Sequence, residues 1–340
     1  MNSTKKILIA NRGVIAIRAL RAAKELGYQV ASVYSTADKN LKHLKLSDEA
    51  ICIGPPDSKD SYLNEAAIIS AAELANVDGI YPGYGFLSEN AEFAEKCKNS
   101  GFKFIGPSHE IISLMGDKIQ AKNLMRQLGV PVVPGYEGPV ESKEQIENEV
   151  KKVGLPVIIK AAAGGGGRGM RIVRELSELW DAIEDARSEA NAAFGSDLVF
   201  IERYLEKPRH VEIQIFGDGK GNAVHLFSRD CSLQRKYQKV IEEAPAINIP
   251  DEKINEIYQI SVNACCELNY EGAGTLEFLY ENGEFFFIEM NTRIQVEHTV
   301  TEMITGVDLV QAQLELAMND VYNFDQSKIK INGHAMQCRI

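Results

Sequence analysis

Residues 6–34, KILIANRGVIAIRALRAAKELGYQVASVY, decide the fold of the N-terminal part of the chain. The apolar run at 6–10 is typical of a buried strand, and residues 14–26 have the periodicity of an amphipathic helix that Gly27 closes. Residues 29–34 again have strand character, so the stretch predicts a βαβ unit. The alternation continues in strands at 49–53, 79–81 and 103–105 and in helices at 64–75 and 90–99. It predicts a parallel sheet with helices on both faces, a Rossmann-like α/β domain.

The turn after the first strand, Asn11-Arg12-Gly13, lacks the Gly-x-Gly-x-x-Gly pattern that lets a pyrophosphate approach a helix N-terminus. The Rossmann-like topology therefore does not predict dinucleotide binding. A glycine-rich segment at 82–86 lies just past a strand's carboxyl end, where open α/β sheets bind ligands. Its spacing is equally typical of a tight turn, and both interpretations stay open.

The pattern changes after a helix at 117–128, because the segment 130–135, VPVVPG, indicates a linker or subdomain boundary. The elements expected beyond it are helices at 143–153 and 177–193 and strands at 157–161, 170–173 and 198–202. A small α+β module of this kind, at about 131–204, often acts as a movable lid. Strands at 210–216 and 223–227, a helix at 251–268 and a hairpin at 274–291 follow.

The run 289–298, EMNTRIQVEH, alternates polar and apolar side chains. As a strand it would place five polar residues on one face: Glu289, Asn291, Arg293, Gln295 and Glu297. An antiparallel strand with a wet outer face is the ordinary interpretation. Asn and Glu are poor strand residues, however, so the run also resembles a strand that presents acid, amide and guanidinium groups to a substrate. The alternating run at 334–340 predicts a last strand without a partner, and we expect a truncated chain.

Composition excludes several classes of function. The chain has 340 residues, enough for two or three compact units, and a net charge of −11, which argues against nucleic-acid binding. No segment has the length of a membrane span or of a signal-peptide core, and we expect a protein of the cytoplasm, or of an organelle matrix after removal of a leader. The six cysteines have no Cys-x-x-Cys spacing and are expected to be reduced thiols.

The segment 160–170, KAAAGGGGRGM, joins two expected strands. Backbone N–H groups of its glycines can close over phosphate oxygens, and Lys160 supplies a positive charge. It is not a P-loop, since no Gly-Lys-Ser/Thr ends it. A flexible hairpin tip is the alternative, but four consecutive glycines are costly to order without a ligand. We therefore expect a phosphate-covering loop.

Two acids, Glu277 and Glu289, lie on the two strands of the last hairpin, and with Asn291 they offer hard oxygen ligands that suit Mg²⁺ or Mn²⁺. A two-residue Asn282-Gly283 turn in a regular ladder would pair Glu277 with Ile288 and turn the acids to opposite faces. The metal hypothesis therefore predicts an odd-length loop or a bulge.

Charged residues also concentrate at 235–243, where Arg235, Lys236 and Lys239 precede Glu242 and Glu243. Such runs are usually solvated loops, yet an acidic protein that binds an anion would need positive charge here. His210 begins a strand and, judged alone, is more typical of a structural residue than of a base.

Together these features resemble the ATP-grasp enzymes and, within them, the biotin carboxylases. The resemblance rests on residues 9–13, 81–90, 115–118, 160–170, 208–212, 229–232 and 289–302. It implies a Rossmann-like N-terminal domain at 1–116 and an ATP-grasp domain at 117–326 with its lid at about 131–204. Residues 327–340 would begin a truncated C-terminal domain.

The implied reaction has two steps. Bicarbonate attacks the γ-phosphate of ATP to give carboxyphosphate and ADP, and the carboxyl group then passes to a ureido nitrogen of biotin on a carrier protein. The ATP site implied by the resemblance comprises Lys118, Lys160, Gly165, Gly166, Gly167, Glu202, Leu205, His210, Gln234, Glu277 and Glu289. Two Mg²⁺ or Mn²⁺ ions would be held by Glu277, Glu289 and Asn291.

The resemblance also implies the acceptor side of the site. Bicarbonate would be bound by Lys239, Arg293, Gln295, Val296 and Glu297, with Glu297 as general base. Arg339 would stabilise the enolate form of biotin, which Tyr84 and Phe86 would also contact. The implied partners are the biotin carboxyl carrier protein and carboxyltransferase subunits, with a homodimer for the full-length protein and neither nucleic acid nor membrane.

Three residues depart from the family pattern: Val14 in place of Glu, Tyr237 in place of His, and Thr299 in place of Pro. The position of Tyr237 is the one at which the family commonly has His near the nucleotide. Another ATP-grasp carboxylate–amine ligase, or an inactive fragment or paralogue, would share the phosphate loop and the acids. The final carboxyl acceptor, whether acetyl-CoA, pyruvate or another compound, is not encoded in this stretch.

Overall fold

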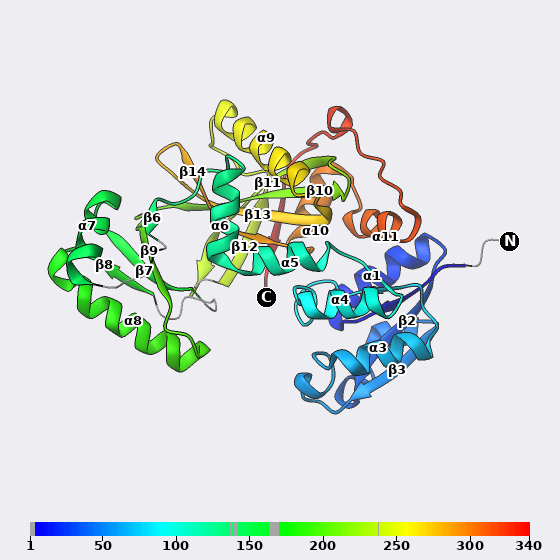
Figure 1. Cartoon of the computed structure of the whole chain (residues 1–340). Coiled ribbons are helices and arrows are strands. Elements are labelled where there is room, and N and C mark those ends of the chain that lie inside the picture. Colours follow the sequence, from blue (N-terminus) through cyan, green and yellow to red (C-terminus); the bar gives the residue numbers. More distant parts are fainter. Residues whose placement is uncertain (1–3, 137, 139–141, 163–169, 237) are drawn as a thin grey trace.

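The computed structural model describes residues 4–136, 138, 142–162, 170–236 and 238–340. Strands in this part of the chain form three sheets, and Figure 1 shows the large central sheet between the N-terminal sheet and a smaller module. All six cysteines are free thiols, as expected.

The N-terminal sheet is parallel, with the strand order β3-β2-β1-β4-β5. Its strands are β1 (Lys6–Ile9), β2 (Gln29–Ser35), β3 (Glu49–Gly54), β4 (Gly79–Tyr81) and β5 (Lys103–Phe104). Its helices are α1 (Gly13–Glu25), α2 (Lys42–Leu46), α3 (Glu65–Leu74), α4 (Ala91–Asn99) and α5 (His109–Gly116), with 3₁₀ turns η1 (Thr36–Asp38) and η2 (Ser58–Asp60). Ile7, Leu8 and Ile9 are fully buried because helices cover both faces of the sheet. The predicted α/β fold is confirmed.

A second, smaller module follows helix α6 (Lys118–Gln127). Its antiparallel sheet has the order β6-β9-β7-β8, and α7 and α8 pack against it. The strands are β6 (Gly135–Tyr136), β7 (Val157–Ala161), β8 (Arg171–Val173) and β9 (Val199–Arg203), and the helices are α7 (Lys143–Val153), η3 (Leu176–Glu178) and α8 (Leu179–Phe194). The segment expected to close over phosphate, with Gly165, Gly166 and Gly167, lies outside the described residues, as does Tyr237.

The central sheet has the order β14-β13-β10-β11-β12-β15. Its strands are β10 (Arg209–Asp218), β11 (Ala223–Arg235), β12 (Gln238–Ala244), β13 (Glu271–Glu281), β14 (Glu284–Asn291) and β15 (Ala335–Cys338). The accompanying helices are α9 (Asp251–Glu267), α10 (His298–Thr305), α11 (Leu309–Asn319) and the 3₁₀ turn η4 (Gln326–Lys328). The expectation of an unpartnered last strand is wrong, because β15 pairs with β12. In the charged run at 235–243, Arg235 ends β11, and Lys239, Glu242 and Glu243 lie on β12, which pairs with β11, so these residues belong to a hairpin rather than to a loop.

The run 289–298 does not form one strand. Strand β14 ends at Asn291, residues 292–297 are irregular, and His298 begins α10. Ile294 is fully buried in a core that it shares with α1, so the chain leaves the sheet to fill that core. The alternation of polar and apolar side chains therefore reflects which side chains are buried, both on β14 and on the irregular turn at 292–297.

The hairpin of β13 and β14 has the predicted bulge. Glu281 pairs with Glu284 around the Asn282-Gly283 turn, where both residues have positive φ angles of 54° and 84°. Phe278 pairs with Phe287, but the next pair joins Glu277 to Glu289, so Ile288 is the extra residue. The bulge puts both acids on one face of the sheet.

Candidate active site

One cavity of about 1310 Å³ lies between the central sheet and the small module. It is lined by these residues singled out from the sequence: Lys118, Lys160, Glu202, Leu205, His210, Gln234, Lys239, Glu277, Glu289, Asn291, Arg293, Gln295, Val296, Glu297 and Arg339. They come from elements far apart in the chain, and the fold brings them to one place. Tyr84 and Phe86 are not among the residues that line this cavity.

Lys239 is surrounded by carboxylates. Its Nζ lies 2.9 Å from Glu277 Oε1 and 2.8 Å from Glu297 Oε1, and it also donates to Glu212. Burial by itself lowers the pKa of Lys239, but Glu277 and Glu297 outweigh it and hold this pKa above its ordinary value. The ammonium group is therefore charged at neutral pH.

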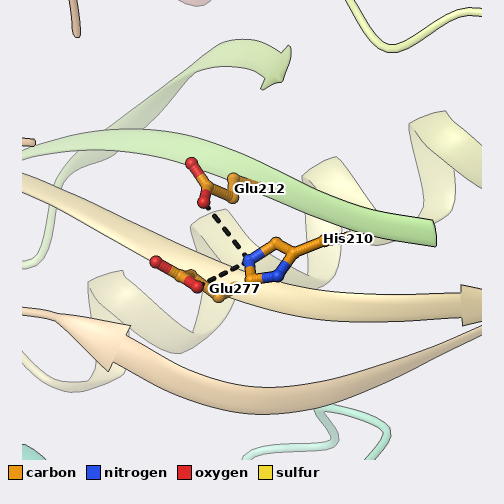
Figure 2. Close-up of side chains that lie close together, drawn as sticks. All are labelled: His210, Glu212 and Glu277. Carbon is orange, nitrogen blue, oxygen red and sulfur yellow. Dashed lines mark ion pairs between the residues drawn. The ribbon is translucent and has the colours of Figure 1, made fainter. Parts of the chain in front are cut away.

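His210 lies between two of the same acids, as Figure 2 shows. Its Nε2 is 2.6 Å from Glu277 Oε2 and 3.3 Å from Glu212 Oε1. Gln234 Nε2 is 3.0 Å from His210 Nδ1 and also donates to the Cys231 carbonyl, so Nδ1 is the acceptor and Nε2 carries the proton. His210 thus lies against the carboxylates of Glu277 and Glu212 at the wall of the cavity.

The surroundings of the two hairpin acids shift their pKa values in opposite directions. Burial by itself raises the pKa of Glu277, but Lys239 and His210 hold it below its ordinary value. Burial raises the pKa of Glu289, and the charge of Glu277 raises it further. A divalent cation would relieve this repulsion, and two carboxylates with Asn291 are a donor set that suits Mg²⁺ or Mn²⁺.

A second group of potential ligands lies close by, since ligand atoms of His210, Glu212 and Glu277 are all within 4.8 Å of one another. Lys239 already compensates the charge of Glu212 and Glu277 on this side. Glu289, the acid whose pKa is raised, does not belong to this second group. The residues predicted to bind metal therefore fit that role better than this second group.

Glu297 is held between two cations. Arg339 Nη2 donates to its Oε2 at 3.0 Å, opposite the contact with Lys239. Burial by itself raises the pKa of Glu297, but Lys239 and Arg229 hold it below its ordinary value. Glu297 is consequently ionised at neutral pH, which is the state that a general base requires.

Arg293 and Arg339 each have a further acidic partner. Arg293 Nε is 2.7 Å from Glu89, and its Nη2 donates to Asn291 Oδ1 at 2.7 Å. Arg339 Nε is 2.5 Å from Glu242. Both guanidinium groups are therefore held in place at the edge of the cavity.

The other end of the cavity carries the predicted nucleotide residues. Lys160 Nζ is 2.5 Å from Glu202 Oε2, and the buried Lys122 pairs with the other oxygen of the same carboxylate. Burial by itself raises the pKa of Glu202, but the two lysines hold it below its ordinary value. Leu205 packs with Val133 and Phe286 and adds an apolar surface.

The 82–86 loop is fixed by Asn11, whose Nδ2 donates to the carbonyls of Pro82 at 2.7 Å and Tyr84 at 2.8 Å. Burial raises the pKa of Tyr84, Arg339 lowers it and Glu297 adds to the rise, so the phenol lies within electrostatic reach of both residues. Phe86 instead stacks on Tyr62, with ring centroids 4.8 Å apart. The biotin contacts of Tyr84 and Phe86 stay predictions.

Glu212, Arg229 and Glu242 are fully buried next to the site, and the sequence analysis gave none of them a role in it. A signal was present for Glu212, because it alternates with His210 and Gln214 on one face of the predicted strand. Arg229 and Glu242 could not be found this way, because β11 was predicted to end at Phe227 and β12 was not predicted.

None of the helices in the described part of the chain has both the length and the apolar character needed to span a bilayer.

Two family models match the sequence. "Biotin carboxylase, N-terminal domain" covers residues 3–112, and "Carbamoyl-phosphate synthase L chain, ATP binding domain" covers residues 117–323. Biotin carboxylase of Haemophilus influenzae is 59% identical over 337 residues, which are 99% of this chain and 75% of that protein.

Solved structures of biotin carboxylases are also similar to this chain. A biotin carboxylase–β-γ-ATP complex from Campylobacter jejuni has a TM-score of 0.93 at 50% identity, covering 98% of this chain and 75% of that one. The biotin carboxylase domain dimer of Hydrogenobacter thermophilus 2-oxoglutarate carboxylase, in complex with MgADP, ADP and bicarbonate, has a TM-score of 0.91 at 46% identity, covering 98% and 74%. The chain belongs to the biotin carboxylase family.

Proposed function

We propose that this chain carboxylates biotin on a carrier protein, using ATP and bicarbonate through carboxyphosphate. The observation that carries the proposal is the shared cavity, which holds Lys160 and Glu202 at one end and Lys239 and Glu297 at the other. A nucleotide and a small anion bound there would meet next to the hairpin acids. Membership of the biotin carboxylase family supports this reaction.

In the first step, Glu297 takes the proton of bicarbonate, and a bicarbonate oxygen forms a bond to the γ-phosphorus of ATP as the bond to the bridging oxygen of ADP breaks. Lys239 and Arg293 offset the negative charge of bicarbonate. Gln295 and the Val296 backbone orient the anion. In the second step the bond between the carboxyl carbon and the phosphate oxygen of carboxyphosphate breaks, and the phosphate that leaves takes the ureido N–H proton as the carboxyl carbon bonds to that nitrogen of biotin. Arg339 stabilises the biotin enolate, and Tyr84 and Phe86 are further contacts.

Glu277, Glu289 and Asn291 would hold two Mg²⁺ or Mn²⁺ ions, which supply positive charge to the triphosphate when bound. Lys118, Lys160, Glu202, Leu205, His210 and Gln234 would contact ATP, and the segment with Gly165, Gly166 and Gly167 would cover its phosphates. The module at about 131–204 would close as a lid and exclude water, since carboxyphosphate hydrolyses readily.

The proposed division of the chain is an N-terminal domain at 1–116, an ATP-grasp domain at 117–326 and the beginning of a third domain at 327–340. Biotin carboxylases are components of biotin-dependent carboxylases, so the proposed partners are a biotin carboxyl carrier protein and carboxyltransferase subunits. We place the protein in the cytoplasm and expect a homodimer, as in the solved Hydrogenobacter domain.

ADP release measured with ATP, Mg²⁺, bicarbonate and free biotin tests the proposal. We expect release that depends on bicarbonate and is stimulated by biotin. Turnover with an amine and no biotin would instead identify a carboxylate–amine ligase. Binding of ATP and Mg²⁺ without bicarbonate-dependent release would identify an inactive member of the family.

A further inference from the structure

We infer that Arg229 is a positioning residue that orients Gln295 and Lys239 for bicarbonate from behind the cavity; the inference rests on the proposed function. Arg229 lies on β11 and is fully buried, and it is not among the residues that line the cavity. Removing a guanidinium group from water is costly, so a fully buried arginine needs hydrogen-bond partners. These partners indicate which groups the arginine holds in place.

Its contacts involve four other elements of the site. Nε and Nη2 lie 3.2 Å and 3.1 Å from Glu212 Oε2, and Nη1 lies 2.7 Å from Gln214 Oε1. Nη1 also donates to Thr301 Oγ1 at 3.0 Å, and Nη2 donates to Thr275 Oγ1 at 3.1 Å and to Gln295 Oε1. The planar guanidinium therefore links β10, β13, α10 and the 292–297 turn at one point.

The contact with Gln295 decides which end of its amide faces the cavity. Arg229 has only donors, so Oε1 must point toward it. The amide nitrogen then points the other way, where Nε2 donates to Glu277 Oε1 at 2.7 Å. A flipped amide would set two donor groups against each other in the buried interior. Gln295 consequently presents an N–H donor to an anion in the cavity.

The contact with Glu212 acts on Lys239. One oxygen of Glu212 accepts from Arg229, and the other accepts from Lys239. Because Arg229 offsets the charge of Glu212 from the interior, Lys239 can also reach Glu277 and Glu297. Without the guanidinium, the Glu212 carboxylate would attract Lys239 alone and draw it away from Glu297.

Thr301 adds a third constraint. Glu297 is the N-cap residue of α10, and Thr301 lies one turn into that helix. Its hydroxyl contact with Arg229 Nη1 therefore holds α10 near the end at which Glu297 is the N-cap residue.

The test is a double-mutant cycle on ADP release, with Arg229→Lys, Gln295→Ala and the combination. Lysine keeps the buried charge but cannot reach Glu212 and Gln295 together. Loss of a hydrogen bond to a charged group predicts a roughly tenfold rise in KM for bicarbonate, with KM for ATP changed less than about twofold. The rise should be smaller when Gln295 is already Ala.

Arg209→Lys is the matched control. Arg209 pairs with Asp230 and with the carbonyls of Ile247 and Asn248 and has no contact with Gln295 or Lys239 among the described residues. In Arg209→Lys, KM for bicarbonate should therefore not rise more than KM for ATP. If Arg229→Lys lowers the yield of folded protein, the isosteric Thr301→Val keeps every charge and should show the same selective rise, but smaller.

Three results would contradict the inference: equal rises in both KM values, effects of Arg229→Lys and Gln295→Ala that add fully, or a loss of thermal stability with unchanged KM values. Absence of bicarbonate-dependent release in the unmodified protein would overturn the proposed function itself, and with it the inference.

Discussion

Glu277 and Glu289 face each other across one hairpin, yet their surroundings move their pKa values in opposite directions. Lys239 and His210 favour the charged form of Glu277, whereas burial and the charge of Glu277 disfavour that of Glu289. The pKa of Glu289 therefore lies above that of Glu277.

This contrast predicts the effect of Glu289→Gln on stability. Since the folded-state pKa of Glu289 is raised, the folded protein binds more protons than the unfolded chain from about pH 4.3 up to that value, and the free energy of unfolding falls as pH rises. In metal-free buffer at pH 7.5 the variant should melt at a higher temperature than the unmodified protein. The difference should vanish below about pH 4, where the side chain is protonated in both states.

Saturating Mg²⁺ should reverse the order of the two melting temperatures, because it stabilises only a protein that binds it. The unmodified protein should then melt at a higher temperature than Glu289→Gln. Calorimetry with and without Mg²⁺ measures both effects. Glu284→Gln, an exposed position on the same strand, is the control and should be insensitive to Mg²⁺. An equal response of both variants to Mg²⁺ would place the metal elsewhere.

Glu297→Gln tests the proposed general base. The amide keeps the shape of the side chain but cannot take a proton, so bicarbonate-dependent ADP release should fall roughly hundredfold or more. Nucleotide binding, measured by calorimetry, should be retained. Glu267→Gln at the exposed end of α9 should leave both unchanged. Release within a few-fold of the unmodified rate would exclude Glu297 as the base.

At the scale of the element, the β13–β14 hairpin determines whether the acids meet. Its two-residue turn sets the pairing of Glu281 with Glu284, and the bulge at Ile288 then moves Glu289 opposite Glu277. The turn requires positive φ at both central residues, which Asn and Gly tolerate better than other residues.

Gly283→Ala should therefore destabilise the protein by about 1 kcal/mol through backbone strain alone, because a Cβ there would meet nothing within 4 Å. The control is Gly116→Ala, which also has open space around its Cβ but no positive φ, and should be neutral or slightly stabilising. Urea unfolding at neutral pH gives both values. Equal effects would mean that the turn is not strained by a side chain.

At the scale of the whole molecule, the N-terminal sheet is joined to the central sheet by a shared core. Ile7, Ile15 and Tyr81 pack in one cluster with Ile294 and Leu309. Arg18 on α1 adds ion pairs across this boundary, 3.0 Å to Glu302 and 2.5 Å to Asp308. Because Glu302 lies on α10, whose N-cap residue is Glu297, this boundary also supports the active site.

Arg18→Met should cost about 2 kcal/mol of unfolding free energy, since it leaves two half-buried carboxylates without their guanidinium partner. Arg21→Met, on the exposed face of the same helix, should stay within about 0.5 kcal/mol of the unmodified protein. Chemical denaturation of the two variants side by side makes the comparison. A similar loss for both would assign the effect to the helix rather than to the ion pairs.

Local patterns predicted most of the helices and strands of the N-terminal part of the chain and of the small module, because periodicity and capping act over a few residues. They missed the helices α2, α5, α10 and α11 and the strands β6 and β12, and they joined β14 to the following turn. In 289–298 a strand and an irregular turn have the same alternation, and only the packing of Ile294 against α1 distinguishes them.

The sequence by itself determined the residue types of the site, the Asn282-Gly283 turn and the need for a bulge. Tertiary structure alone decided that β15 pairs with β12, which brings Arg339 to Glu297 and Glu242, and that Arg229 is buried behind Gln295 and Glu212. These contacts join residues far apart in the chain. Their energy depends on which surfaces are buried together, and no local preference of the backbone encodes that choice.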